Sequence, residues 1–503
     1  MVAATAPLSF PFKLLSPLTS PSTIKIFNSH LNLSTKPQIH HNKSTFFSAA
    51  FHQTPCEHNS KTNNHIHTSP QSIQLTDSGI LFSVFQDIGF DEQETQIILD
   101  KYPDLQLVSV ESIYSRIQSL RSVGIHGVAL YRVIVKSPEV LIAEEVQSLL
   151  SYVQKDLKEE IELSKLQRVL ASTEPRLFAG FAEKVRLLVE HGVPEEKVVY
   201  VLNNVNISKA FCCKSVEEVE RTIVYLKRFG GYELIVRRPG LLNFDLNNQL
   251  IPRVGFLLEL SGGDEDATGV VLRKLPAILT YTDDHMRSHV EFLRSFAGLT
   301  EPEIFKIVLV YPNIASVSRE RKLHPRVDFL KQCGLNPNDI FRFLIKAPLF
   351  LSLSFRDNLS KKLAFLMKIG YENGSKELAI AMGAVTRTSC ENMQMVIDIF
   401  LNYGLSCEDI LAMSKKHPQV LQYNHKSLEK KMEYLIEDIG RDIGELLAFP
   451  AFLGYKLDDR IKHRYELKKE ITGEGMSLNK LLSVSTERFS KKNKAEKVKQ
   501  DRK

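Results

Sequence analysis

Apolar runs in this chain are broken by proline at a regular interval. In LIKAPLFLSLS, Pro348 stands inside a nearly continuous apolar run. A helix must end before it, because proline has no N–H to donate and its ring clashes with the preceding turn. The apolar-flanked prolines are Pro103, Pro138, Pro175, Pro239, Pro276, Pro312, Pro348, Pro418 and Pro450. Successive gaps are 32 to 37 residues, except for two gaps of 64 and 70, near whose midpoints Ser208 and Gly383 replace proline.

Between two prolines, the hydrophobic and polar positions predict two helices. In HPRVDFLKQCGLNPNDIFRFLIKAP, Val327, Phe329 and Leu330 form an apolar stripe that ends at Gly334. Asn336 then provides an N-cap, followed by a first-turn proline and a first-turn acid. The pattern recurs in GLTEPEIF at Gly298, GLSCEDIL at Gly404 and GVPEEKVV at Gly192. Each unit is therefore expected to be helix, tight turn, helix and a proline-led apolar segment that docks one hairpin on the next.

A repeat of this length predicts an all-α helical-hairpin solenoid, in which each unit buries its apolar face against its neighbours. We expect about ten units of ~35 residues over residues 76–470, with no intervening linker. No apolar run is long enough to span a membrane. A monomer is expected.

The two ends of the chain differ in composition from the repeats. No Asp or Glu precedes Glu57 and no Arg precedes Arg116, while Ser and Thr are frequent. Such a segment is typical of an organellar transit peptide, and the lack of arginine favours a chloroplast over a mitochondrion. We therefore predict a transit peptide and disordered segment over residues 1–75. Residues 471–503 are predicted to be a basic, disordered tail, either solvated or in sequence-blind contact with nucleic acid.

The repeat resembles one known family in its phasing. First-helix motifs PRVGFL at Pro252, PRVDFL at Pro325, KKLAFL at Lys361 and KKMEYL at Lys430, with the G-L-[ST]-x-x-[DE]-I turn, are similar to those of the mitochondrial transcription termination factor (mTERF) family. The resemblance covers about residues 78 to 465; Ser208, Gly383 and the acidic SGGDED stretch depart from it. It implies a left-handed superhelix whose groove holds double-stranded nucleic acid. The implied role is organellar transcription termination or, in some plant members, RNA splicing or processing.

Cations recur two residues before the prolines. They are Lys101, Lys136, Arg237, Lys274, Lys346 and Lys416. These positions would suit contacts with a phosphate backbone. They are explained equally well by the helix dipole, because a cation in the last turn of a helix is favourable.

A second row of basic residues lies thirteen or fourteen residues after a proline. It comprises Arg116, Arg253, His289, Arg326, Lys362 and Lys431. These positions are in mid-helix, where the dipole gives no reason for a cation. Stacking would align them into a ladder, which we expect to contact phosphates. The alternative is a solvated helix face.

Enzymatic motifs are missing from the sequence. It contains no P-loop, no dinucleotide-binding glycine motif, no zinc-protease motif and no nucleophile elbow. The six cysteines include no C-x-x-C. We therefore expect no enzyme, metal or cofactor. Three classes remain: a duplex-DNA binder that acts on the organellar transcription machinery, an RNA-binding splicing or processing factor, and a protein-binding scaffold.

Overall fold

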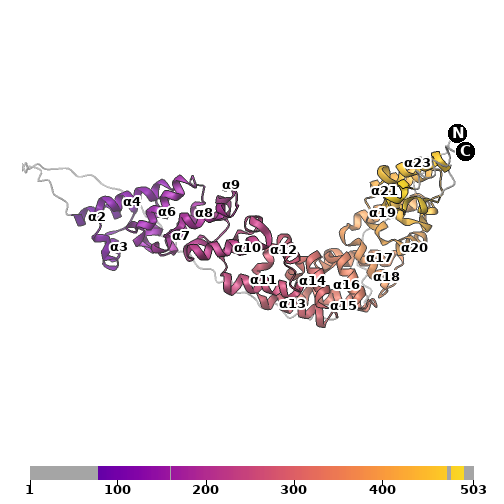
Figure 1. Cartoon of the computed structure of the whole chain (residues 1–503), viewed down its shortest axis with the longest axis horizontal. Coiled ribbons are helices and arrows are strands. Elements are labelled where there is room, and N and C mark those ends of the chain that lie inside the picture. Colours follow the sequence, from indigo (N-terminus) through magenta and orange to yellow (C-terminus); the bar gives the residue numbers. More distant parts are fainter. Residues whose placement is uncertain (1–76, 159, 473–476, 492–503) are drawn as a thin grey trace, which may run out of the picture. The chain divides into compact units, whose positions relative to one another are not determined.

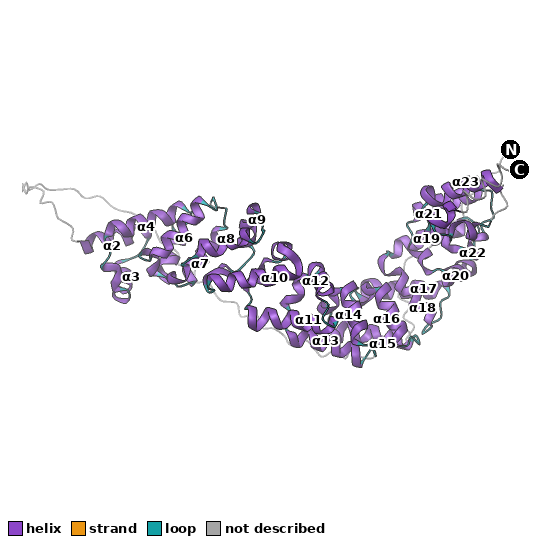
Figure 2. Cartoon of the chain, in the orientation of Figure 1, coloured by secondary structure: helices purple, strands orange, loops and turns teal. Residues whose placement is uncertain are grey.

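The computed structural model describes residues 77–158, 160–472 and 477–491, and within these ranges every regular element is helical (Figure 2). No strand occurs among these residues. The prediction of an all-α fold is therefore confirmed. The predicted transit peptide lies outside the described residues. In the parts that the structure describes, no helix is both long and apolar enough to cross a membrane.

Helical hairpins follow one another along the chain, each closed by a short turn (Figure 1). The chain divides into two bodies, one up to Leu246 and one from Asn247. In the first body the elements are α2 (Asp77–Ile88), α3 (Glu92–Lys101), η1 (Pro103–Gln106), α4 (Val110–Ser122), α5 (Val128–Lys136), η2 (Pro138–Leu141), α6 (Glu144–Lys155), α7 (Leu163–Ser172), η3 (Pro175–Phe178), α8 (Phe181–Glu190), α9 (Glu195–Asn203), η4 (Ser208–Cys212), α10 (Val216–Arg237) and η5 (Pro239–Asn243).

The second body repeats the same order of hairpins. It begins with η6 (Leu246–Leu250) and continues with α11 (Ile251–Ser261), α12 (Glu265–Lys274), η7 (Pro276–Thr280), α13 (Asp283–Ser295), α14 (Glu301–Val310), η8 (Pro312–Ser316), η9 (Arg319–Leu323), α15 (His324–Gln332), α16 (Pro337–Lys346), η10 (Pro348–Leu351), η11 (Phe355–Leu359), α17 (Ser360–Ile369), α18 (Lys376–Ala384), η12 (Val385–Arg387), α19 (Cys390–Asn402), α20 (Cys407–Lys416), η13 (Pro418–Gln422), α21 (His425–Glu433), η14 (Tyr434–Asp438), α22 (Glu445–Ala448), η15 (Pro450–Gly454), η16 (Leu457–Lys462), α23 (His463–Thr472) and α24 (Leu478–Leu482).

Proline ends the second helix of a unit at the expected place. Helix α16 stops at Lys346, and Pro348 opens the 3₁₀ turn η10. The next apolar residues anchor the turn: Phe350 is fully buried, with its ring 5.1 Å from that of Phe343 and 6.0 Å from that of Phe329. Burying such a side chain contributes about 1.5–3 kcal/mol. The proline-led turn is therefore the seam between the helices, although Leu349, also expected in the seam, is only half-buried.

The two units without proline keep the same architecture. Ser208 opens the helical turn η4, which contacts η5, and the turn η12 follows Gly383 and contacts η13. Gly383 lies where α16 and α18 approach closely: a Cβ there would be 2.6 Å from Cε2 of Phe343. The small residue is thus required by packing.

Helix α10 consists of two helical segments joined across a kink. Gly231 has φ +67° and ψ −170°, outside the helical region, and marks this kink. Only glycine adopts this conformation readily. The second helix of this unit is consequently short.

The C-terminal boundary of the array differs from the prediction. Helix α24 lies within the segment expected to be a disordered tail, yet Leu478, Leu481 and Leu482 are buried. Leu481 and Leu482 accept hydrogen bonds from Arg464 of α23. The basic composition of this segment concealed a short apolar cap, so the expected start of the tail at residue 471 is too early.

Candidate nucleic-acid interface

The second helices of the hairpins form a continuous layer in the second body. Helix α14 contacts α12 and α16, and α18 contacts α16 and α20. Because each hairpin repeats the same path, these helices run in the same direction and end along one edge. We call it the junction edge: it consists of the C-terminal halves of α12, α14, α16 and α20 and the turns η7, η8, η10 and η13. Figure 1 shows α12, α14 and α16 in sequence.

The row of cations two residues before the prolines is exposed. This holds for Lys101, Lys136, Arg237, Lys274, Lys346 and Lys416. Of these, Lys274, Lys346 and Lys416 lie on the junction edge.

Two of these lysines also link neighbouring units. Lys274 Nζ donates to the carbonyl of Leu309 at 2.7 Å, and Lys416 Nζ donates to that of Leu447 at 2.8 Å. Both acceptors lie in the last turn of the next second helix, where carbonyls lack helical partners and the dipole is negative. An ammonium group has three donors, so each lysine retains N–H groups for another acceptor.

Charges of opposite sign are separated along the second helices. The first turns carry acids, namely Glu265 and Asp266 in α12, Glu301 and Glu303 in α14, Asp339 in α16, and Glu408 and Asp409 in α20. The C-terminal halves of the same helices contain no acid and carry the exposed cations Arg273, Lys274, Lys306, Arg342, Lys346, Lys415 and Lys416. The junction edge is therefore cationic and the hairpin-turn edge acidic.

The second predicted row of basic residues lies inside the array. Arg253, His289, Arg326, Lys362 and Lys431 are all buried; Arg326 is 3% and Lys362 1% exposed, and Arg116 is half-buried. Mid-helix cations were expected to form a ladder on the surface. Their burial corrects that expectation, because a buried donor that is already bonded offers nothing to a phosphate.

Each member of this buried row donates to backbone carbonyls of the turn that ends its own unit. The bonds are Arg116 Nη1 to Val140 (3.1 Å) and Ala143 (2.5 Å), Arg253 Nη1 to Leu279 (2.7 Å), His289 Nε2 to Val317 (2.9 Å), Arg326 Nε to Phe350 (2.9 Å), Lys362 Nζ to Thr386 (3.0 Å) and Lys431 Nζ to Leu453 (2.8 Å). The carbonyls at the end of a helical turn have no helical partner. The row therefore clamps the first helix of each unit to its proline-led turn.

Burial also changes the acidity of the clamp residues. It lowers the pKa of Arg326 to about 10 and lowers the pKa of Lys362 and Lys431 below the usual lysine range. Removal from water disfavours the charged form, and the carbonyl dipoles compensate for it. Arg326 remains protonated at neutral pH.

Arg464 is a further clamp residue that was not predicted from the sequence. It is buried and donates to the carbonyls of Leu481 and, at 2.7 Å, Val484. It lies fourteen residues after Pro450, within the spacing of thirteen or fourteen residues found for the other members. This spacing between a proline and a basic residue could have identified Arg464 from the sequence of the last unit.

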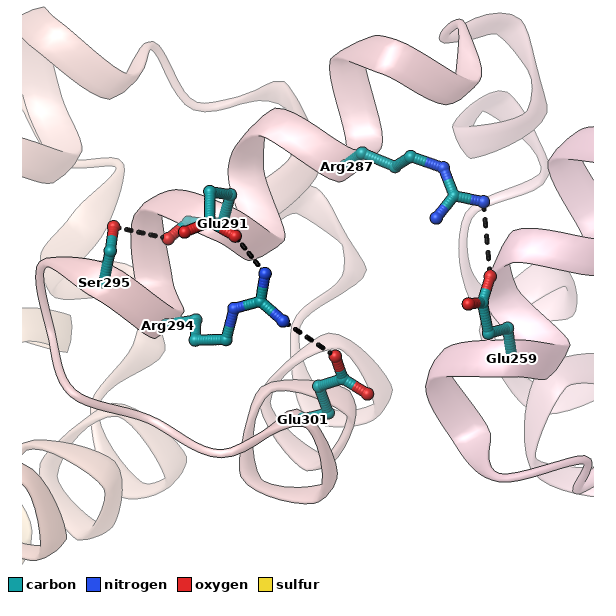
Figure 3. Close-up of polar contacts among 6 residues, drawn as sticks. All are labelled: Glu259, Arg287, Glu291, Arg294, Ser295 and Glu301. Atoms are coloured by element: carbon teal, nitrogen blue, oxygen red, sulfur yellow. Dashed lines mark hydrogen bonds and ion pairs between the residues drawn. The ribbon is translucent and has the colours of Figure 1, made fainter.

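The two exposed arginines of α13 are held in ion pairs. Figure 3 shows Arg287 of α13 bonded to Glu259 of α11 (3.2 Å), and Arg294 bonded to Glu291 and to Glu301 of α14 (3.2 Å). Arg287 also pairs with Asp283 at 2.7 Å. These two arginines are therefore locally neutralised, whereas the C-terminal halves of α12, α14, α16 and α20 carry exposed cations and no acid. We take the junction edge as the candidate surface for binding an anionic polymer.

These features define a helical-hairpin repeat protein with one cationic edge. The chain belongs to the mTERF family, whose sequence profile matches residues 82–333 and 318–490. It is 57% identical over 411 residues to transcription termination factor MTERF8, chloroplastic, of Arabidopsis thaliana, which covers 82% of each chain. It is 25% identical over 238 residues to transcription termination factor MTERF15, mitochondrial, of the same plant, covering 46% of this chain and 53% of that protein.

Proposed function

We propose that this protein binds double-stranded DNA along the junction edge and thereby regulates or terminates transcription in the chloroplast. The observation that supports this proposal is the separation of charge on the second helices, which places exposed cations on one edge and acids on the other. A phosphate backbone repeats its negative charge along an axis, and a stacked array repeats its cations in the same way.

The composition of the chain favours a duplex over a single strand. Single-stranded nucleic acids are held largely by stacking of their bases on aromatic side chains. The chain has no tryptophan, and Tyr423, which follows the turn η13, is engaged by His417 at 2.7 Å. Cations that repeat along a helical framework can instead follow the phosphate backbone of a duplex.

The compartment is inferred from two independent features. A relative that aligns with 82% of this chain is named as chloroplastic. The first residues lack acids and arginine, as a plastid transit peptide does. A protein bound to plastid DNA would obstruct or position a polymerase, so the transcription machinery is the proposed protein partner.

Crosslinking in isolated chloroplasts tests this proposal. The bound DNA and RNA are recovered with the protein and sequenced, and purified full-length protein is then titrated with the recovered sequence as duplex DNA and as RNA at several salt concentrations. We expect recovery of discrete DNA sites and duplex affinity that falls steeply with salt. Enrichment of RNA alone would point to splicing or processing, and recovery of neither would favour a protein scaffold.

A further inference from the structure

Two proline-led turns of the junction edge expose the residue directly after the proline. In η8 the residues Pro312, Ile314 and Ala315 are buried, and in η13 Pro418, Val420 and Leu421 are buried. The residue directly after the proline faces solvent, because Asn313 in η8 and Gln419 in η13 are both exposed. The buried residues anchor both turns, so Asn313 and Gln419 occupy corresponding places in their units.

Asn313 and Gln419 are chemically unusual at this position. The equivalent residues Ala277, Leu349 and Ala451 carry no side-chain hydrogen-bonding group. The amides of Asn313 and Gln419 make no hydrogen bond among the described residues. By contrast, Asn336 caps α16 through Asp339 N, and Gln332 donates to Asp328. Neither free amide therefore has a structural role in its turn.

The surroundings of both amides suit a nucleic-acid duplex. Lys416 lies three residues before Gln419 on the cationic edge. Near Asn313, the position two before the proline is Val310, an apolar residue 45% exposed. The positive charge near Val310 comes from Lys274 of the preceding unit, because its ammonium group donates a hydrogen bond to the carbonyl of Leu309. An exposed apolar side chain beside a free amide fits a base edge better than a phosphate.

We propose that Asn313 and Gln419 read base edges in the major groove of the bound duplex and set its sequence preference. This inference rests on the proposed function. A carboxamide can donate to one atom and accept from its neighbour, and this pairing matches N7 and N6 of adenine. Each residue therefore specifies one A·T pair, while Lys274, Lys346 and Lys416 hold the flanking phosphates. Val310 is placed to contact a thymine methyl group.

The first body has no amide after the prolines of its repeats: Gly240 follows Pro239, and the exposed Arg176 after Pro175 is paired with Glu174. In the first body, the residues after Pro103 and Pro138 are Asp104 and Glu139, both exposed acids. A carboxylate close to the backbone repels phosphate. Within the described part of the junction edge, the position after the proline carries no acid.

Selection from a randomised duplex library tests the inference. Full-length wild type, Asn313→Ala and Gln419→Ala are compared with the control Asn338→Ala, which removes an exposed amide from the first turn of α16 on the acidic edge. We expect the wild type to select a motif with two separated A·T positions. Each variant should lose discrimination at one of them by a factor of roughly 5 to 150, while its affinity for random duplex and its salt slope stay unchanged.

The possible outcomes separate the inference from the proposed function. Unchanged preference in both variants, or a wild type that binds duplex without preference, would overturn the reading role. If the wild type binds no duplex, the proposed function fails and the inference fails with it. Unchanged melting temperatures of the variants exclude misfolding as the cause of an altered preference.

Discussion

Arg326 and Phe350 are joined by a hydrogen bond from the guanidinium Nε to the backbone carbonyl, 2.9 Å long. Arg326 lies in the first turn of α15, directly after η9, and Phe350 lies on the turn that closes the same unit. The same guanidinium donates to Leu353 and, at 2.9 Å, to Lys322. A buried charge thus satisfies three carbonyls and fixes the turn against the first helix.

Replacing Arg326 with methionine should lower the free energy of unfolding by roughly 3–5 kcal/mol, because each buried carbonyl left unsatisfied costs about 1–3 kcal/mol. The carbonyls of Phe350 and Leu353 would be left without their donor. Equilibrium urea denaturation followed by circular dichroism measures the effect. Arg321→Met, an exposed neighbour of the same charge, should change stability by less than about 0.5 kcal/mol. Equal urea midpoints for Arg326→Met and Arg321→Met would show that Arg326 does not stabilise the contact between the first helix and the proline-led turn.

Removing a cation from the junction edge should change the salt dependence of DNA binding. Lys274→Ala, Lys346→Ala and Lys416→Ala should each reduce the slope of log affinity against log salt by about 0.9, because each lost phosphate contact releases fewer counterions. Binding should weaken on all sequences alike. Titration of labelled duplex at several salt concentrations measures the slopes.

The matched control for this series is Lys376→Ala. Lys376 lies in the first turn of α18 and is paired with Asp339 at 2.7 Å, away from the junction edge. Its loss should leave the slope unchanged. If Lys376→Ala and the three edge variants behave alike, the junction edge is not the binding surface.

Gly383→Ala should destabilise the contact between α16 and α18. The added Cβ would come within 2.6 Å of Phe343. Overpacking of this kind costs roughly 1–3 kcal/mol, measured by thermal or urea denaturation. Phe343→Leu introduced with Gly383→Ala should recover part of the loss relative to the sum of the single changes. Strict additivity would show that the two residues do not meet.

His417 should make the protein sensitive to mild acid. Burial lowers its pKa below the ordinary 6.5, and its Nε2 lies 2.7 Å from the hydroxyl of Tyr423. The unfolded chain therefore takes up the proton first. The stability contributed by neutral His417 is present above pH 6.5 and is lost as the pH falls through the folded-state pKa. Between pH 7.5 and pH 5.5, the free energy of unfolding of His417→Gln should fall less than that of the wild type, as measured by urea denaturation. An identical fall in both proteins would contradict a role for His417 in the acid sensitivity.

Local signals in the sequence were enough to define the hairpin architecture. Proline cannot continue a helix, so Pro276, Pro348 and Pro418 fixed where α12, α16 and α20 end. N-caps such as Asn336, whose side chain accepts from Asp339 N at 2.9 Å, fixed where second helices begin. These signals act within one or two turns of the chain and need no partner elsewhere.

Which basic residues face solvent depends instead on tertiary packing. Arg326 and Lys346 recur with equal regularity; from the sequence, the mid-helix row was assigned to phosphate and the C-terminal row had an alternative explanation in the helix dipole. Packing buries the first and exposes the second. The carbonyls that attract Arg326 belong to Phe350 and Leu353, and they come within reach only after the hairpin has closed. Periodicity shows that a position is equivalent from unit to unit, whereas its environment depends on the groups that stacking brings against it.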